Sequence, residues 1–419
     1  MMEATAPALI LRTSPIRALA LLAALALSGC SSVPRLPTVV YIAVTANSDQ
    51  HLDTELREDY RQRLWLLVEG FQQINPRTTF QMGIYPEEQL FSAMARRSRA
   101  GLEPDLLFIN GDTALRLLRA GLVDPFPADP ALLRLFEPAV LARLRTADGR
   151  LAGLPILVQA QVSCYDRRTV QQPPRDLTEL LSISASGQAV GLTVDPFNLL
   201  WTAGSLGALP ALEGALQGRA LSLADHQALV RWLAWLQNAG GQQRVTFFAS
   251  QPETDAQFIA GRLSWIPCRS TALPMLRRRL GARLGVAPLP DGQDGRASAV
   301  NRLRVMALGR HSSRAGRERA LSFSRFAVNP LTQRTLTTGS QTVLPANRFV
   351  SVPVQSSQLL QTLEIANQQG LQTDAMAGLL HGHETRLRSL QNLFTQVVFG
   401  ETTPRAARDH LLRILAKNR

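Results

Sequence analysis

Few residue clusters in this chain have the spacing that catalysis or metal binding requires. The densest set of metal-binding residue types is His381-Gly382-His383-Glu384, whose histidines lack the i, i+4 spacing of a zinc-protease helix. This segment is predicted to be a solvated turn. No Gly-x-Ser-x-Gly segment supplies a serine nucleophile, and no Walker-type loop could cradle a phosphate. The sequence thus predicts a protein that is not an enzyme and that holds neither a metal nor a cofactor.

Polar side chains follow several predicted strands, and a small molecule could bind there. Asn110-Gly111-Asp112 closes one apolar run, and Asp195, Asn198 and Trp201 follow another. The carboxyl ends of the strands in an open α/β sheet meet at one edge, where ligands bind. Alternatively, Asn110 and Asp112 are N-caps of the helix that follows, and Trp201 is a core residue.

Strands and helices alternate along the chain, which favours a mostly parallel, doubly wound sheet. Apolar, β-branched runs typical of buried strands are followed by segments with apolar residues at helical spacing. The expected strands are 38–45, 78–84, 106–110, 154–165, 190–194, 262–266, 284–287 and 305–308. The expected helices are 59–74, 86–100, 113–119, 223–238, 255–261 and 316–328, with a helical tail from 357.

Composition and charge narrow the class of protein. The chain has 419 residues, of which 45% are hydrophobic, enough for about two domains with sizeable cores. The formal net charge is +13, yet Lys417 is the single lysine, and the arginines are spread out without interleaved aromatic residues. That pattern argues against a nucleic-acid-binding protein. The arginines at 277–279 are expected along a solvated helix.

The first thirty residues have the pattern of an export signal. Arg12 and Arg17 precede an apolar run at 18–27 that is too short to span a bilayer, and the run closes on Leu27-Ser28-Gly29-Cys30. This segment resembles the lipobox of bacterial lipoproteins, in which the chain is cut before the cysteine and the cysteine is lipidated. We therefore expect a signal peptide at 1–29 and a lipidated Cys30 with a tether over 30–38, which holds the protein at a membrane. The alternatives are an ordinary secretory signal with an incidental cysteine and a short membrane anchor.

Seven short motifs occur in order over nearly the whole remaining chain. They are F-Q-Q-I-N-P at 71–76, G-L-E-P-D-L-L at 101–107, A-G-L-V-D-P at 120–125, G-L-P-I at 153–156 running into C-Y-D-R at 164–167, F-I-A-G-R-L-S at 258–264, G-V-A-P-L-P at 285–290 and V-L-P-A at 343–346. Each motif alone is weak. In this order and at this spacing, the chain resembles the extracellular solute-binding proteins of ABC importers, in the family that includes maltose-binding protein.

The resemblance implies a periplasmic-binding-protein-like fold of two α/β lobes, joined by crossing hinge strands with the ligand cleft between them. The first lobe would hold 39–158 plus 289–345, and the second 162–286 plus 346–419. It also implies a monomer that binds a small-molecule solute, with carbohydrate the favoured class, and delivers it to ABC permease subunits. A non-transport lipoprotein on the same fold, either a sensor partner or an envelope scaffold, is the alternative.

The resemblance also assigns ligand-binding positions. Asp112 stands where the family often has a carboxylate, Gln159 where maltose-binding protein has a ligand-binding acid, and Arg269-Ser270 where the family often has Gly-Pro-Trp. An arginine there would suit a carboxylate, a phosphate or a hydroxyl-rich ligand, or would form a salt bridge at the lobe edge. The full set of expected ligand contacts is Asp49, Asn110, Asp112, Gln159, Asp195, Asn198, Trp201, Arg269, Ser270 and Asn301.

Cysteine and tyrosine usage adds two points. Lipidation of Cys30 would leave Cys164 and Cys268, and an exported compartment permits a disulfide between them without requiring one. Iron-binding relatives in the same broad group use adjacent tyrosines, whereas the four tyrosines here are scattered. The sequence therefore leaves the cysteine pairing open and argues against an iron carrier.

Overall fold

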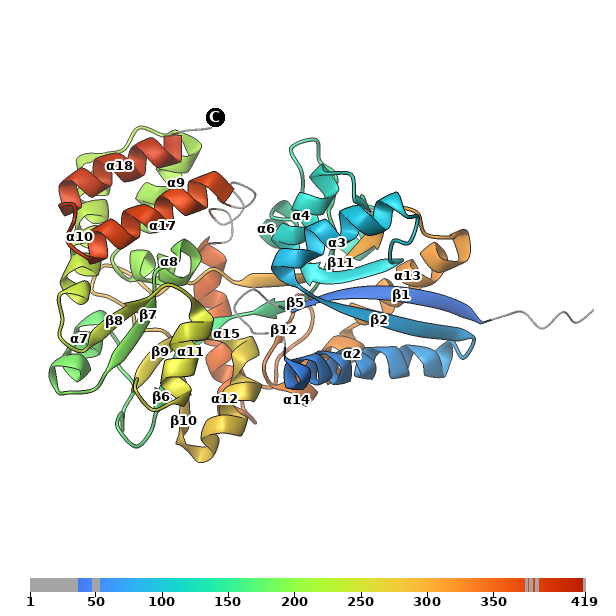
Figure 1. Ribbon diagram of the computed structural model, residues 1–419, viewed down its shortest axis with the longest axis horizontal. Coiled ribbons are helices and arrows are strands. Elements are labelled where there is room, and N and C mark those ends of the chain that lie inside the picture. The colour runs from blue at the N-terminus through green and yellow to red at the C-terminus, as the bar shows by residue number, and fades with distance from the viewer. Residues whose placement is uncertain (1–36, 47–52, 374–375, 377–379, 381–383, 417–419) are drawn as a thin grey trace, which may run out of the picture.

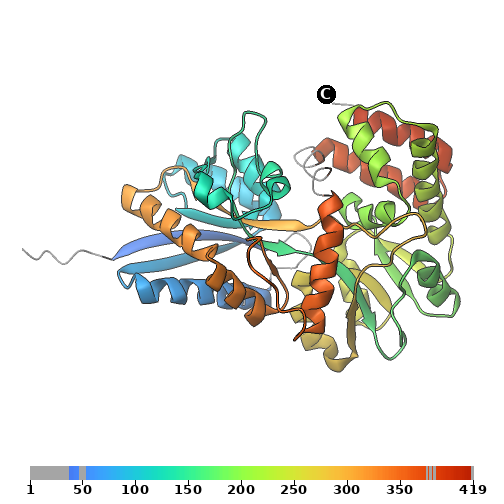
Figure 2. The ribbon, with the colours of Figure 1, turned by 180° about the vertical axis from the view of Figure 1, so that it is seen from behind.

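The chain folds into two lobes that lie side by side, each built on its own β-sheet (Figure 1). The computed structural model describes residues 37–46, 53–373, 376, 380 and 384–416. Cys30, Asp49 and residues 381–383 of the histidine cluster lie outside the described residues. Seen from behind, helix α15 (Gln358–Gly370) stands at the boundary between the lobes (Figure 2). The expected pair of α/β lobes is confirmed.

The first sheet has the strand order β12-β5-β11-β3-β1-β2, with β4 paired to β11. Its strands are β1 (Thr38–Ala46), β2 (Thr78–Pro86), β3 (Leu106–Asn110), β4 (Val123–Asp124), β5 (Leu154–Gln159), β11 (Arg302–Gly309) and β12 (Leu344–Pro345). Strand β1 runs parallel to β2 and β3. Every residue of β3 is buried, as expected for a strand with helices on both faces.

The other half of this sheet is antiparallel, so the prediction of a mostly parallel sheet is wrong there. Strand β11 runs antiparallel to β3 and β5, and β12 runs antiparallel to β5. A parallel neighbour requires a crossover within one sheet. The chain instead enters β11 from the other lobe, so that no crossover connection forces it to be parallel.

Helices cover both faces of the first sheet. Helix α2 (Thr54–Ile74) begins at Asp53, whose carboxylate accepts a hydrogen bond from the Leu56 N–H at 2.8 Å. Near its other end, Phe71 packs edge-on against Phe80 and Phe323, with ring centroids 5.9 and 5.3 Å apart. Helices α13 (Arg314–Ala327) and α14 (Pro330–Ser340) pack beside α2, and the opposite face carries α3 (Glu87–Arg99), α4 (Gly111–Arg119) and α6 (Pro138–Ala142) (Figure 1).

The second sheet has the order β10-β6-β9-β7-β8. Its strands are β6 (Gln161–Asp166), β7 (Val190–Thr193), β8 (Val245–Phe248), β9 (Trp265–Arg269) and β10 (Leu284–Ala287). The sequence patterns did not predict β8. The helices around the sheet include α8 (Pro196–Ser205), α9 (Leu209–Gln217), α10 (Leu223–Gly240), α11 (Gln251–Ile259), α12 (Leu273–Leu280), α17 (Glu384–Val398) and α18 (Pro404–Ala416).

The C-terminal helices complete the second lobe. Trp232 of α10 donates its indole N–H to the Thr202 hydroxyl at 2.8 Å and packs edge-on against Phe394 of α17. Leu411 and Leu415 of α18 belong to the same buried cluster. The helical tail predicted from the sequence is therefore part of a core rather than an appendage.

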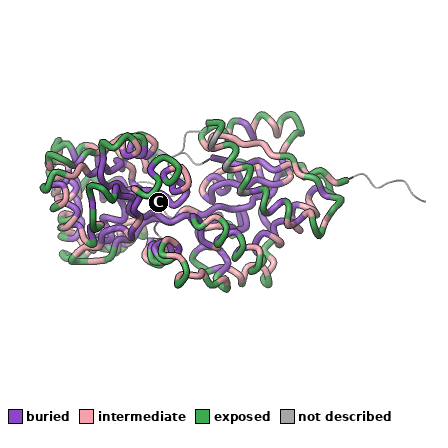
Figure 3. Tube along the Cα trace, turned by 90° about the horizontal axis from the view of Figure 1, so that it is seen from below, coloured by how far each residue is buried: buried purple, intermediate pink, exposed green. Residues whose placement is uncertain are grey.

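The chain passes between the lobes three times. It leaves the first sheet after Gln159 and enters the second at Gln161, so that Ala160 is the junction. It returns between β10 and β11 and passes again between β12 and α15. The trace between the lobes is largely buried (Figure 3).

Two segments next to these crossings lie on the lobe opposite to the expected one. Residues 289–300 pack on the second lobe: the Ser205 hydroxyl donates to the Pro290 carbonyl at 2.9 Å, and the Thr373 hydroxyl donates to the Ala299 carbonyl at 2.7 Å. The Ala346 N–H, expected in the second lobe, donates to the Ile156 carbonyl of the first. Turn motifs mark where a strand stops, but they do not show on which surface the following coil lies.

Cys164 and Cys268 form a disulfide, with their Cα atoms 5.8 Å apart. The two residues lie on β6 and β9, which are antiparallel neighbours, and both are fully buried. The bridge ties the strand that leaves the first crossing to the strand that ends at Arg269.

Candidate ligand-binding site

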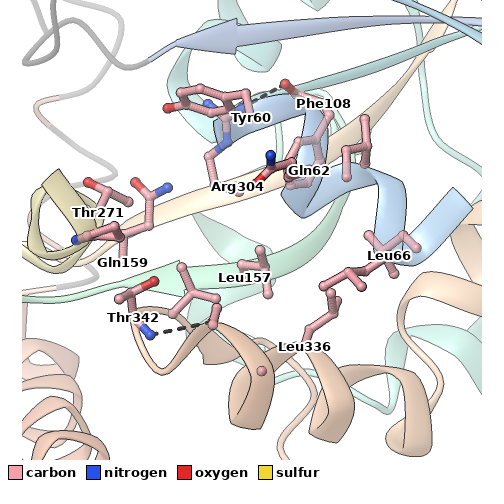
Figure 4. Close-up of a pocket in the computed structure, with 16 residues that line it drawn as sticks. Tyr60, Gln62, Leu66, Phe108, Leu157, Gln159, Thr271, Arg304, Leu336 and Thr342 are labelled. Atoms are coloured by element: carbon pink, nitrogen blue, oxygen red, sulfur yellow. Dashed lines mark hydrogen bonds between the residues drawn. The ribbon is translucent and has the colours of Figure 1, made fainter. Parts of the chain in front are cut away.

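A cavity of about 440 Å³ opens where the two lobes meet (Figure 4). The first lobe contributes most of the wall, from α2, β3, β5, β11 and α14, and the second lobe contributes Thr271 and Pro274. A volume in this range suits a small molecule. The cavity is therefore the candidate site.

The sequence builds the wall of the cavity by two simple periodicities. Tyr60, Leu64 and Leu67 are spaced by four and three residues along α2, so they share one face of the helix. Leu157 and Gln159 are two residues apart on β5 and so share one face of the strand. Arg304 of β11 lies opposite Leu157 in the register of the sheet. One helix face and one sheet face thus enclose the space.

Arg304 is fixed at the carboxyl ends of β1 and β3. It is 1% exposed, and its guanidinium lies 4.8 Å from the centroid of the Phe108 ring. It donates to the Thr45 hydroxyl at 3.0 Å, the Thr45 carbonyl at 2.9 Å, the Phe108 carbonyl at 2.8 Å and the Asn110 amide oxygen at 3.1 Å. The site thus contains a buried positive charge that is held by oxygens of two strand ends.

Asn110 is the second member of this network. Its amide oxygen accepts from Arg304, while its amide nitrogen donates to Glu87 Oε2 at 2.5 Å. Thr113 donates to Glu87 Oε1, also at 2.5 Å. Sequence reasoning missed both Arg304 and Glu87. Arg304 is the charged residue between Leu303 and the apolar residues 305–308 of β11, and this placement could have identified it as a buried polar anchor.

The capping roles expected at α4 differ from those observed. The helix begins at Gly111, and Asn110 holds the N-cap position without a side-chain capping bond, since its amide binds Arg304 and Glu87. Asp112 is half-buried within the first helical turn. The N-cap role predicted for Asp112 is therefore wrong. A carboxylate in the first turn nevertheless stabilises the helix, because it interacts favourably with the positive end of the helix dipole.

Of three further expected contacts, Asp195 precedes α8 while Asn198 and Trp201 lie on it, and the structure gives them other roles. Asp195 is the N-cap, with its carboxylate accepting from the Asn198 N–H at 3.0 Å. The Asn198 amide oxygen accepts from Arg269 Nη2 at 3.0 Å. Trp201 is 0% exposed, with its ring centroid 6.2 Å from that of Trp265. The ligand contact predicted for Trp201 is therefore wrong, because the ring has no face left for a solute.

Arg269, Ser270 and Asn301 are buried at the second crossing rather than open to a cleft. Arg269 Nη1 donates to the Val300 carbonyl at 2.8 Å, and the Asn301 amide donates to the Asn367 carbonyl at 3.1 Å. Arg269 is thus buried rather than at an exposed lobe edge, and its guanidinium donates to a carbonyl and an amide oxygen inside the protein. Among the expected contacts that the structure describes, Gln159 lines the cavity.

The described part of the chain contains neither a metal-binding cluster nor a helix that could cross a membrane. No group of three or more His, Cys, Asp or Glu residues there is arranged to hold a metal ion. None of the helices described there is both long enough and apolar enough to cross a membrane. The cavity at the lobe junction therefore stands as the candidate site.

A family model described as bacterial extracellular solute-binding protein matches residues 67–361, and the chain belongs to this family. Members of the family are binding proteins that act outside the cytoplasm, not enzymes. No curated protein sequence matches the chain.

Solved structures of several solute-binding proteins share the fold. The GacH receptor of Streptomyces glaucescens GLA.O, solved unliganded and with acarbose, is 16% identical, with a TM-score of 0.70 over 92% of this chain and 100% of that chain. The maltodextrin-binding protein MalE1 of L. casei BL23 is 16% identical, with a TM-score of 0.67 over 92% and 100%. The maltotriose-binding protein of Thermus thermophilus is 13% identical, with a TM-score of 0.66 over 90% and 99%. The periplasmic-binding-protein-like fold is thus confirmed.

Proposed function

We propose that this protein captures a small solute outside the cytoplasm, as a monomer, and delivers it to the permease of an ABC importer. The observation that carries the proposal is the cavity between the lobes, with Gln159 and Arg304 from the first and Thr271 from the second. A solute that contacts both lobes binds the closed arrangement more tightly than an open one, and so shifts the population toward closure. No covalent bond is made or broken in this cycle.

Carbohydrate is the class of solute that we propose. The structural neighbours are described with acarbose and maltotriose or as maltodextrin-binding. Gln159 is the proposed ligand contact in the cavity, since its amide can both donate to and accept from hydroxyl groups. Asp112 does not line the cavity; it is half-buried in the first turn of α4, and its role as a second contact stays a prediction.

A lipid on Cys30 is a separate proposal, which rests on the Leu27-Ser28-Gly29-Cys30 pattern. Two or three acyl chains would hold the protein at a membrane stably, and residues 30–38 would act as the tether. Mass spectrometry of the mature N-terminus tests this. A chain that begins at Cys30 with added acyl mass supports the anchor, whereas an unmodified Cys30 rejects it.

A thermal-shift screen of the mature protein tests solute capture. The panel includes maltose, maltotriose, acarbose, other sugars and unrelated polar solutes. A ligand that binds only the folded chain raises the midpoint, and the stabilisation grows with the logarithm of the ratio of ligand concentration to Kd. Small-angle scattering with the stabilising ligand then checks whether the lobes close. If no solute stabilises the protein, the sensor partner or envelope scaffold becomes the better description.

A further inference from the structure

The cavity is polar at one end and aliphatic at the other, with Arg304 and Gln62 between the two ends (Figure 4). Gln159, Thr271 and Thr342 lie together at one end, near the crossing between the lobes. Leu66 of α2 and Leu336 of α14 lie at the other end. Leu64, Leu67, Leu157 and Val343 add to the aliphatic wall. The lining therefore changes character along the length of the site.

The aliphatic end is unsuited to a sugar that carries hydroxyls on every side. A hydroxyl group that is moved from water to a leucine wall loses its hydrogen bonds, and leucine side chains offer none in return. Sugar sites usually supply a flat aromatic ring instead. Trp201, Trp232 and Trp265 are fully buried elsewhere, and the aromatic residues that line the described cavity are Tyr60 and Phe108.

The polar end offers groups that a solute can bind. The Thr342 hydroxyl is buried, with the residue 1% exposed, and it has no hydrogen-bond partner among the described residues. Gln159 is 4% exposed and lies beside it along the wall. A buried hydroxyl without a partner is costly. Its oxygen is enclosed in this arrangement, so a ligand oxygen or N–H at this end would satisfy it after the Thr342 side chain turns toward the cavity.

We propose that the solute is amphipathic, with a hydroxyl-bearing head at the Gln159–Thr342 end and a compact apolar group against Leu66 and Leu336. A glycoside with a short alkyl or aromatic aglycone has this chemistry. The cavity volume of about 440 Å³ accommodates one such molecule but not a lipid with long acyl chains or a peptide segment. This inference rests on the proposed function, because it specifies the solute of the same site.

The test uses N-phenyl-1-naphthylamine, a small dye that fluoresces in apolar surroundings, with the full mature protein. We expect saturable binding at one site and displacement by short alkyl β-D-glucosides below their critical micelle concentrations. Each methylene that enters the aliphatic end should improve displacement about four-fold, until the cavity is full. Glucose itself should displace the dye far more weakly than hexyl glucoside.

Matched variants locate the binding. Leu66→Ser removes an aliphatic group that lines the cavity and is 54% exposed, so the fold tolerates the change. Ile74→Ser is the control, since Ile74 lies on the same helix, is 68% exposed and does not line the cavity. We expect Leu66→Ser to weaken dye and hexyl glucoside binding about five-fold. Val343→Thr, which keeps the side-chain shape, should act in the same direction, and Ile74→Ser should change neither affinity.

Three results would overturn the inference. They are dye binding that does not saturate, displacement that does not depend on alkyl chain length (including no displacement at all), and equal affinities for Leu66→Ser and Ile74→Ser. If free sugars stabilise the protein in the thermal-shift screen while dye displacement by the alkyl glucosides does not change with chain length, the amphipathic solute is rejected and the proposed function stands.

Discussion

Arg143 and Arg269, one from each lobe, hold neighbouring carbonyl groups of the segment that returns the chain to the first lobe. Arg143 Nη2 donates to the Asn301 carbonyl at 2.7 Å, and Arg269 Nη1 donates to the Val300 carbonyl at 2.8 Å. The two arginines are 5% and 2% exposed. Because hydrogen bonds from a charged donor are stronger than neutral ones, these contacts fix the hinge from both sides.

Replacing Arg269 should therefore destabilise the folded chain. Arg269→Met removes the donors to the Val300 carbonyl and the Asn198 amide oxygen, and both acceptors belong to buried residues. We expect the free energy of unfolding to fall by about 2–4 kcal/mol, measured by urea denaturation. Arg277→Met, at an exposed position on α12, is the control and should leave the midpoint unchanged. Equal midpoints for the two variants would contradict a stabilising role for the Arg269 hydrogen bonds.

The disulfide should make stability depend on redox conditions. Cys164 and Cys268 are 104 residues apart in sequence, so their bridge removes considerable freedom from the unfolded chain. The double variant Cys164→Ala, Cys268→Ala should be less stable by about 3 kcal/mol. Urea denaturation with and without a reducing agent checks this. The reducing agent should lower the midpoint of the wild type and leave that of the double variant unchanged. An unchanged wild-type midpoint in the presence of the reducing agent would refute the prediction.

Gln159 should affect solute binding more than folding. Gln159→Leu keeps a side chain of similar size in the cavity wall but removes its hydrogen-bonding groups. We expect the affinity for a solute identified by thermal shift to fall about ten-fold, measured by isothermal titration calorimetry. Gln396→Leu, at an exposed position on α17, is the matched control. Identical affinities for the two variants would remove Gln159 from the site.

Asp166 should make stability fall in acid. Burial raises the pKa of this carboxyl, but hydrogen bonds from Arg168 and Arg283 outweigh burial and hold the pKa well below the ordinary value of 3.8. A group whose pKa is lower in the folded chain stabilises it above the unfolded pKa, and the stabilisation is lost as pH falls through the folded value. The wild type should exceed Asp166→Asn in unfolding free energy by a constant amount above about pH 5.

The pH series itself checks the assignment of Asp166. Below pH 3.8 the difference between the wild type and Asp166→Asn should shrink steadily. Urea denaturation at several pH values measures it. A difference that stays the same down to the lowest pH would show that the two arginines do not hold Asp166 ionised.

The lobes could be predicted from sequence because their signals are local. The buried strand at 106–110 and the capped, amphipathic helices are encoded by neighbouring residues, and ordered short motifs indicated the family. The antiparallel half of the first sheet could not be predicted this way. It depends on β11 being entered from the other lobe, and no local pattern records where a strand comes from.

The candidate site was predicted less well for a related reason. Polar residues after strands were expected to face a cleft, yet Asn110 binds Arg304, Asn198 binds Arg269, and Asp195 caps a helix. A polar residue at a strand end can form hydrogen bonds either with a ligand or with other groups of the protein. Which of these it does depends on the residues that lie near it in the fold. Gln159 was identified by its place in a family motif and does line the cavity.

The route of the chain through the lobes also has a consequence for biogenesis. The first sheet needs β11, which begins at Arg302, and the buried cluster of the second lobe needs Phe394 and Leu411. Neither lobe can therefore finish folding while the ribosome is still making the middle of the chain. Because both cores are completed late, the nascent chain stays unfolded for longer. An unfolded chain is the form that can pass through an export channel.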